Sequence, residues 1–197
     1  MASRPYPSTP LPRSSPGASD PGPLRTFLLL NVLGGIAVLG SYVHGFVAYP
    51  EVVSQMWGGV PDAWRPLYTT NMFLAAAGYF AFTSFVLVRV LRHDARVADR
   101  FGLGFFSLLY AAILIPSALW MPLTYWMVTS PGDLVWLLVR LDLALVGLGS
   151  LGVLASLFQL RPATRGPFFW LAVVGALAFC LQTAVLDAVV WPAFFPR

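Results

Sequence analysis

This chain of 197 residues contains five long apolar stretches separated by shorter, more polar segments. The stretches cover approximately residues 26–48, 66–91, 102–127, 134–160 and 167–191. Each is long enough for a helix that crosses the hydrocarbon core of a bilayer, which takes about 20 residues. Strands of a membrane barrel need about 10 residues, and other open structures leave backbone groups unpaired in lipid. The pattern therefore predicts an all-α integral membrane protein, a bundle of five transmembrane helices.

The segment before the first stretch has a different composition. Residues 1–24 are rich in Pro, Ser and Gly and show no apolar period, which predicts a disordered N-terminal tail followed by a membrane domain over 25–197. The tail lacks the apolar centre of a secretory signal. Its Arg and Ser content resembles a transit peptide, but its prolines disfavour an amphipathic helix. A cytosolic tail is the preferred interpretation.

The arginines lie mainly on one side of the predicted membrane. The tail, the second loop and the fourth loop hold Arg4, Arg13, Arg25, Arg89, Arg92, Arg96, Arg100, Arg161 and Arg165. The first loop has Arg65, the third loop has none, and Arg197 ends the chain. Because basic loops stay in the cytoplasm, the N-terminus is predicted to be cytoplasmic and the C-terminus outside. We expect the bacterial plasma membrane, with an organellar membrane as the alternative.

The rest of the composition excludes several kinds of site. Charged residues make up 10% of the chain and are scattered among the spans, so nucleic acid is not an expected partner. The lone Cys180 allows no intrachain disulfide. His44 and His93 lie a membrane thickness apart and cannot bind one metal together. No phosphate loop and no nucleophile beside a base are present. No metal site and no catalytic residues are predicted.

The tryptophans are distributed unevenly. Six of the seven fall in the outer half or the first loop, namely Trp57, Trp64, Trp120, Trp126, Trp136 and Trp191, and Trp170 lies near the inner face. Aromatic belts normally occupy both interfaces of a membrane. The asymmetry predicts a pocket for an apolar small molecule on the outer side.

Arg140, Asp142 and Asp187 are ionisable residues inside the predicted spans. Such groups cost about 3 kcal/mol or more at mid-membrane and often mark a functional site. Arg140 and Asp142 are two positions apart, so they point about 200° away from each other on one helix. We predict a structural ion pair between Arg140 and Asp187, with Asp142 and His44 as polar groups of the interior. The alternative is that Arg140 extends outward to the membrane surface.

The third stretch carries a further pattern. The segment 109–125 reads LYAAILIPSALWMPLTY and has Tyr110, Trp120, Pro122 and Tyr125 in order. It resembles the third helix of the TspO/MBR family of translocator and tryptophan-rich sensory proteins, in which a Leu-Tyr pair precedes a tryptophan, a proline and an aromatic pair.

Other segments extend this resemblance with some differences. The fourth stretch is similar to the family's fourth helix, although Asp142 lies two places later, and Asp187 stands where the family's fifth helix has asparagine. Residues 61–66 resemble the family's Pro-Trp-Pro loop, and 75–82 its second helix. In the third helix Ile113, Pro116 and Ser117 differ from the family pattern.

The resemblance implies a function. It implies a pocket below the first loop that binds a flat apolar molecule such as a tetrapyrrole or sterol, for sensing or transport. No cofactor is expected to be required; a porphyrin or haem is expected as a ligand. The bilayer is a partner, and a homodimer is an expected assembly. The ligand-binding candidates are Trp64, Asn71, Trp120, Tyr125, Trp126 and Asp187.

Two alternatives remain open at this point. One is an intramembrane enzyme that modifies an isoprenoid or another lipid, with Asp142 and Asp187 as acid and base. The other is a packing subunit of a larger membrane complex. The small residues of 147–156 would allow close helix contact, either inside the bundle or in such an assembly.

Overall fold

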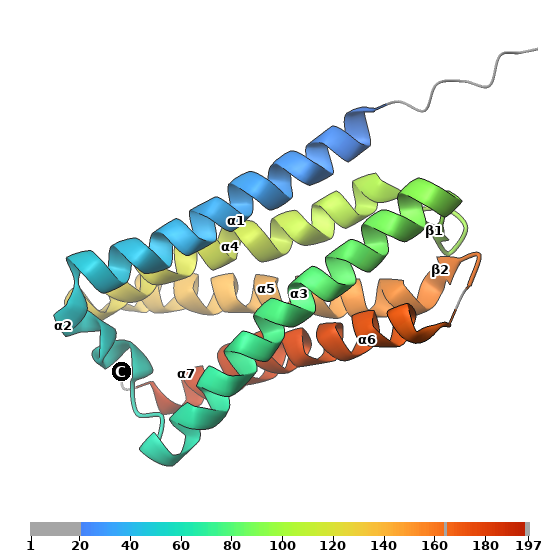
Figure 1. Cartoon of the computed structure of the whole chain (residues 1–197). Coiled ribbons are helices and arrows are strands. Elements are labelled where there is room, and N and C mark those ends of the chain that lie inside the picture. The colour runs from blue at the N-terminus through green and yellow to red at the C-terminus, as the bar shows by residue number, and fades with distance from the viewer. Residues whose placement is uncertain (1–20, 164, 196–197) are drawn as a thin grey trace, which may run out of the picture.

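The computed structural model describes residues 21–163 and 165–195 (Figure 1). The first, third and fourth membrane-length helices are α1 (Gly22–Ala48), α4 (Leu103–Thr129) and α5 (Asp133–Gln159). The second joins η2 (Asp62–Trp64) to α3 (Arg65–His93), and the last joins α6 (Pro167–Cys180), η3 (Leu181–Val190) and α7 (Trp191–Phe194). All five are long and apolar enough to cross a membrane, which confirms the predicted all-α five-helix architecture.

The first helix begins earlier than expected. Residues 1–20 of the predicted disordered tail lie outside the described residues, while its last residues, from Gly22, already belong to α1. Pro23 stands in the first turn of α1. Proline suits this place because its fixed φ angle is helical and its missing N–H would have no partner there. The boundary between tail and membrane domain therefore lies before residue 25.

Each helix packs against a small number of neighbours. α1 lies along α4, α4 along α5, α5 along α6 and η3, and α6 along α3 (Figure 1). α3 and α1 diverge toward the first loop, and the hydroxyl group of Tyr79 donates to Asn31 Oδ1 at 2.6 Å where they meet. Most large apolar side chains of α1 are exposed. This is expected in lipid, where an exposed leucine costs nothing.

The two ends of the bundle are closed differently. At one end, strands β1 (Arg96–Val97) and β2 (Leu160–Arg161) pair antiparallel and join the second and fourth loops. At the other, the first loop folds as α2 (Pro50–Val53), η1 (Gln55–Trp57) and η2. Trp191 Nε1 donates to the carbonyl of Met56 at 2.9 Å, and the Gly59 amide donates to the Phe194 carbonyl at 2.8 Å. The first loop is thus tied to the end of the last span.

α3 and α6 cross at two glycines. A Cβ atom on Gly78 would lie 2.3 Å from the carbonyl oxygen of Gly175, and one on Gly175 would lie 2.7 Å from the Cα of Gly78. Neither backbone atom can move aside without shifting a helix. Close approach of this kind is a main source of helix association in lipid, where apolar burial supplies no driving force.

We predict that Gly78→Ala lowers the thermal unfolding temperature of the detergent-solubilised protein. The added methyl group would force α3 and α6 apart, at a cost of about 1–3 kcal/mol. Gly35→Ala is the matched control, because a Cβ there meets nothing within 4 Å. It should leave the unfolding temperature unchanged or raise it, since alanine is the better helix former. Equal unfolding temperatures for the two variants would contradict this packing.

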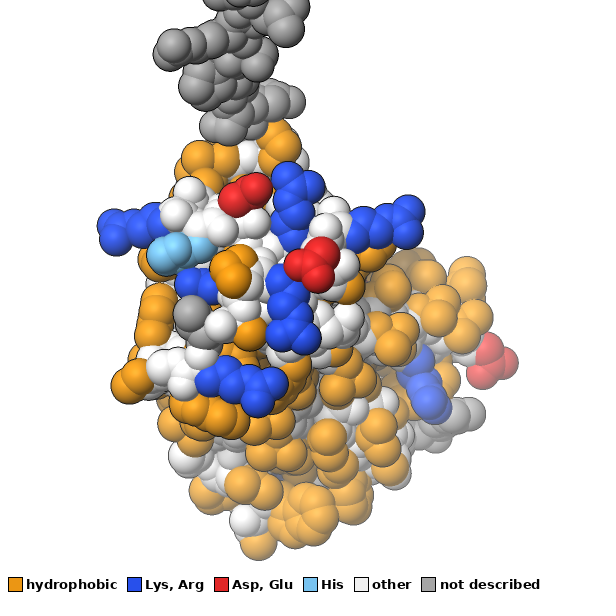
Figure 2. All heavy atoms as spheres, turned by 90° about the vertical axis from the view of Figure 1, so that its right-hand side faces the viewer, with side chains coloured by type: hydrophobic (Ala, Val, Ile, Leu, Met, Phe, Trp, Pro, Cys, Tyr) orange, Lys and Arg blue, Asp and Glu red, His pale blue; other side chains and the backbone are white. Residues whose placement is uncertain are grey.

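The end that carries β1 and β2 is strongly basic. We call it the arginine-rich end. Among the described residues of its loops and adjoining helix turns it holds Arg89, Arg92, Arg96, Arg100, Arg161 and Arg165, against the acids Asp94 and Asp99. Figure 2 shows these basic side chains spread over that face. The positive-inside rule predicts that this end faces the cytoplasm.

The orientation can be tested with single cysteines in a Cys180→Ser background. A cysteine at Ser54, in the first loop, should react from outside intact cells with a charged maleimide that does not cross membranes. A cysteine at Arg100, in the second loop, should react after the membrane is opened. The reverse pattern would show that the arginine-rich end faces outward.

Candidate functional site

The last span changes its helical geometry where its polar residues lie. Over Leu181–Val190 it forms a π-helix, η3, with hydrogen bonds between residues five apart. Such segments are rare and often occur at functional sites. Gln182 Nε2 donates to Asp187 Oδ1 at 2.9 Å. In an α-helix residues five apart point about 140° from each other. The π geometry therefore brings this amide and this carboxyl group together.

A chain of hydrogen bonds links Asp187 to α3. The side-chain amide of Asn71 donates to Gln182 Oε1 and to the carbonyl of Ala178, both at 3.1 Å. One turn away, the hydroxyl group of Tyr68 donates to the carbonyl of Leu186 at 3.0 Å. Each contact pairs polar groups that lipid cannot satisfy. The chain Asn71–Gln182–Asp187 therefore anchors α3 to the π-helix.

A second carboxyl group, that of Asp142 on α5, is buried in the same half of the bundle. It is 5% exposed, and its Oδ2 atom has no hydrogen-bond partner among the described residues. The phenol of Tyr42, on α1, lies within electrostatic range of both Asp142 and Asp187. Four spans thus contribute to one polar centre. We call Tyr42, Asn71, Asp142, Gln182 and Asp187 the carboxyl cluster.

Aromatic rings pack against this cluster. The ring of Trp120 stacks on Tyr42 at a centroid distance of 5.7 Å and meets the edge of Trp191 at 6.4 Å. Trp191 lies 6.1 Å from Trp136 and 4.6 Å from Phe195, and Trp136 stacks on Phe195 at 5.6 Å. We call Trp120, Trp136, Trp191 and Phe195 the aromatic layer. Tyr42 joins the two groups, with its ring against the layer and its hydroxyl group near the carboxyls.

The structure brings some of the predicted ligand-binding residues together. Trp120 lies in the aromatic layer, and Asn71 and Asp187 lie in the carboxyl cluster. Tyr125 packs on Tyr49 at a centroid distance of 4.1 Å, in an apolar group beneath the first loop against which Tyr42 and Trp120 also pack. Trp64 and Trp126 are 44% and 46% exposed, so neither lines the interior. These two tryptophans are placed like interface anchors.

His44 is not an interior group. It is exposed, and its ring meets the edge of Tyr49 at 5.5 Å. The prediction that it joins Asp142 in the polar interior is therefore not supported by its position on α1.

The predicted ion pair between Arg140 and Asp187 is not formed. Arg140 is exposed, and Asp187 accepts a hydrogen bond from Gln182 instead. The ion pairs found across the described ranges are Arg65–Asp62 at 3.0 Å and Arg96–Asp94 at 3.7 Å. The reason is the spacing: because Asp142 faces the interior, Arg140, two positions earlier, must face the lipid. Its long side chain can extend toward the outer surface.

Sequence reasoning missed Gln182 and Tyr42 as members of the site. Gln182 did carry a signal, because an amide in the middle of an apolar span needs a partner inside the protein. Its partner lies five positions away, a spacing that α-helical geometry does not suggest. Tyr42 carried no such signal, since a tyrosine near a helix end is commonly an interface anchor.

Two hollows in the structure lie away from the aromatic layer and the carboxyl cluster. One is an open apolar groove between α1 and α4, lined by residues such as Leu33, Gly34 and Ala118. The other is a small depression at the arginine-rich end. In the aromatic layer the rings pack against one another, so a molecule that binds there must separate them. Among residues 21–163 and 165–195, no three His, Cys, Asp or Glu side chains gather as a metal site would require.

Comparisons with protein-family models, with curated proteins and with solved structures gave no match to this chain.

We predict that Gln182→Leu destabilises the protein by about 1–3 kcal/mol, because Asp187 and Asn71 would both lose a buried hydrogen-bond partner. Thermal unfolding in detergent measures the effect. Gln159→Leu is the control, since Gln159 is exposed at the end of α5 and bonds its own helix. Asp187→Asn, which keeps an acceptor oxygen, should unfold near the wild-type temperature. An unchanged Gln182→Leu variant would contradict a structural role for the hydrogen-bond chain.

Proposed function

We propose that this protein binds a flat, apolar small molecule in the outer half of its bundle, as a sensing or transport-assisting protein of the TspO kind. The observation that carries the proposal is the aromatic layer, which meets the carboxyl cluster through the stacked rings of Trp120 and Tyr42. Flat ring faces bury flat apolar surface well, and a few polar groups beneath them fix a ligand's orientation. Ordinary helix packing does not require a buried and a half-buried carboxyl group.

The polar groups favour a ligand with a hydrogen-bond donor. Asp142 Oδ2 is an acceptor that no described residue satisfies, and a buried acceptor without a partner costs about 1–3 kcal/mol. Within the described residues no arginine side chain forms an ion pair with Asp142 or Asp187. A ligand hydroxyl or N–H group would supply the missing bond. The hydroxyl group of a sterol and the pyrrole N–H groups of a porphyrin both fit this requirement.

The packing of the helices favours entry of a ligand from the side. α1 packs mainly on α4, and α1 and α3 diverge toward the first loop (Figure 1). Tyr42 on α1 is the ring that covers Trp120 on that side. A small outward movement of α1 would uncover the layer and leave the α3 to η3 hydrogen bonds intact. We therefore propose that the ligand enters from the membrane between α1 and α3.

The packing-subunit alternative finds less support in α5. A Cβ on Gly147 would meet Ala184 at 3.1 Å, and one on Gly149 would meet Ile113 at 2.8 Å. These glycines are used for close contacts within the bundle, with η3 and α4. They are not free for a partner chain.

Titration of the purified protein with protoporphyrin IX should quench tryptophan fluorescence saturably at micromolar ligand. Trp120→Leu should bind about tenfold more weakly, a loss of about 1.4 kcal/mol, because the ring that stacks on Tyr42 is removed. Trp170→Leu is the control: Trp170 is exposed at the opposite end, so its loss should leave the affinity unchanged. A sterol should compete if both use the layer. Absence of saturable quenching, or equal effects of the two substitutions, would overturn the proposal.

The enzyme alternative is tested by measuring both the affinity for the ligand and the turnover of an isoprenoid substrate. This alternative remains because Tyr42 lies within electrostatic range of two carboxyl groups. Asp142→Asn and Asp187→Asn should change the affinity of a binding protein. In an enzyme these variants would retain binding and lose turnover of an isoprenoid substrate.

A further inference from the structure

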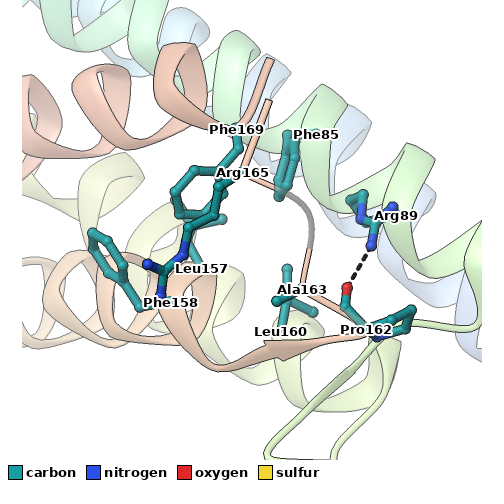
Figure 3. A pocket seen from close by; sticks show the side chains of 9 residues that line it. All are labelled: Phe85, Arg89, Leu157, Phe158, Leu160, Pro162, Ala163, Arg165 and Phe169. Atoms are coloured by element: carbon teal, nitrogen blue, oxygen red, sulfur yellow. Dashed lines mark hydrogen bonds between the residues drawn. The ribbon is translucent and has the colours of Figure 1, made fainter. Parts of the chain in front are cut away.

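A depression lies at the arginine-rich end, far from the carboxyl cluster. It is formed by the end of α3, the end of α5, the segment after β2 and the first turn of α6 (Figure 3). Phe85, Leu157 and Phe169 line its apolar part, and Arg89 and Arg165 lie on opposite sides of it in Figure 3. The depression therefore has arginine side chains on two sides and apolar, mainly aromatic side chains between them.

Arg89 is a buried cation without a carboxylate partner. Its side chain is 7% exposed, and no acidic side chain lies within ion-pair distance of it in the described ranges. One guanidinium nitrogen, Nη2, donates to the carbonyl of Pro162 (Figure 3). Burial of a charge that lacks a counterion is costly, so such groups are normally paired. An anion bound beside Arg89 would supply the counterion that the described residues do not.

The surroundings strengthen the attraction for an anion. Arg165 is exposed beside the depression, and α6, a helix of 14 residues, begins at Pro167 next to it. The N-terminus of a helix carries partial positive charge. The acids at this end are exposed, and Asp94 already pairs with Arg96 at 3.7 Å. The local charge is therefore positive, as the face in Figure 2 also shows.

The size and the walls favour a lipid phosphate over a larger anion. The hollow measures about 10 Å³, enough for one water-sized group. One phosphate oxygen could enter, with the rest of the headgroup left at the mouth. The exposed rings of Phe158, Phe168 and Trp170 contact Phe85 or Phe169 of the depression, so an acyl chain would lie against them. Hydrogen bonds from arginine to phosphate are charge-assisted and therefore strong.

We propose that this depression binds the phosphate group of an anionic phospholipid, with Arg89 as its buried partner and Arg165 at the rim. Basic pockets between spans on the cytoplasmic side are typical sites for such headgroups. This site is separate from the proposed small-molecule site and does not depend on it.

The proposal is tested with the full chain in micelles of a neutral detergent and a fluorescent short-chain phosphatidylglycerol. Arg165→Gln should weaken binding several-fold, and Arg89→Gln at least tenfold. Arg100→Gln is the charge-matched control, because Arg100 is exposed at the same end and contacts Phe101. It should bind within twofold of the wild type. Because Arg89 is buried, its variant is first checked for helicity and unfolding temperature; Arg165 is exposed, so its variant keeps the test valid.

Each outcome decides the proposal. Equal losses for Arg100→Gln and Arg165→Gln would show general attraction to a basic surface and would overturn the site. Displacement by inorganic phosphate at the same concentration as the lipid would overturn the assignment to a lipid. Two results together would support the proposal. The wild-type protein should bind phosphatidylglycerol equally well when the micelles contain phosphatidylcholine, and Arg165→Gln should bind phosphatidylglycerol several-fold more weakly.

Discussion

A polar group inside a membrane must find its partner within the protein, because the hydrocarbon core offers none. This constraint explains most of the structure. It makes every span a helix, and it joins α3 to η3 through Asn71, Gln182 and Asp187. It also pairs Tyr110 with Thr83 at 2.8 Å, and Tyr79 with Asn31, across neighbouring helices. These bonds hold in place helices that lipid would otherwise solvate equally well when apart.

Two buried charged residues, Asp142 and Arg89, form no ion pair within the described residues. Asp142 keeps one oxygen without a partner, and Arg89 keeps a buried positive charge without a carboxylate. They lie in opposite halves of the bundle and carry opposite charges. The first lacks a hydrogen-bond donor beside flat aromatic faces, and the second lacks an anion beside the headgroup region. The same physical argument therefore leads to a small apolar ligand at one end and a lipid phosphate at the other.

Close helix contact and local helix geometry work together in positioning the outer site. Gly78 and Gly175 let α3 approach α6 to backbone contact. From that crossing, α3 continues beside the π-helix, so that Tyr68 and Asn71 reach it. A π segment is less regular than the α-helix it interrupts. It is tolerated here because its hydrogen bonds with α3 and the aromatic layer surround it on the inner side.

The sequence by itself determined the number, type and approximate extent of the spans, because apolar length alone decides which segments lipid can accept. It also placed the tryptophans and the arginines at opposite ends, since each helix runs in a known direction once the spans are counted. Which way a side chain faces, and which partner it meets, depended on the tertiary structure. Arg140 and Asp187 lie at similar depth, yet the rotation of α5 about its axis turns Arg140 toward lipid. The π-helix brings Asp187 within hydrogen-bond distance of Gln182. The depth of a residue in the membrane follows from counting residues along its helix. The direction in which its side chain points depends on packing between helices that are far apart in the chain.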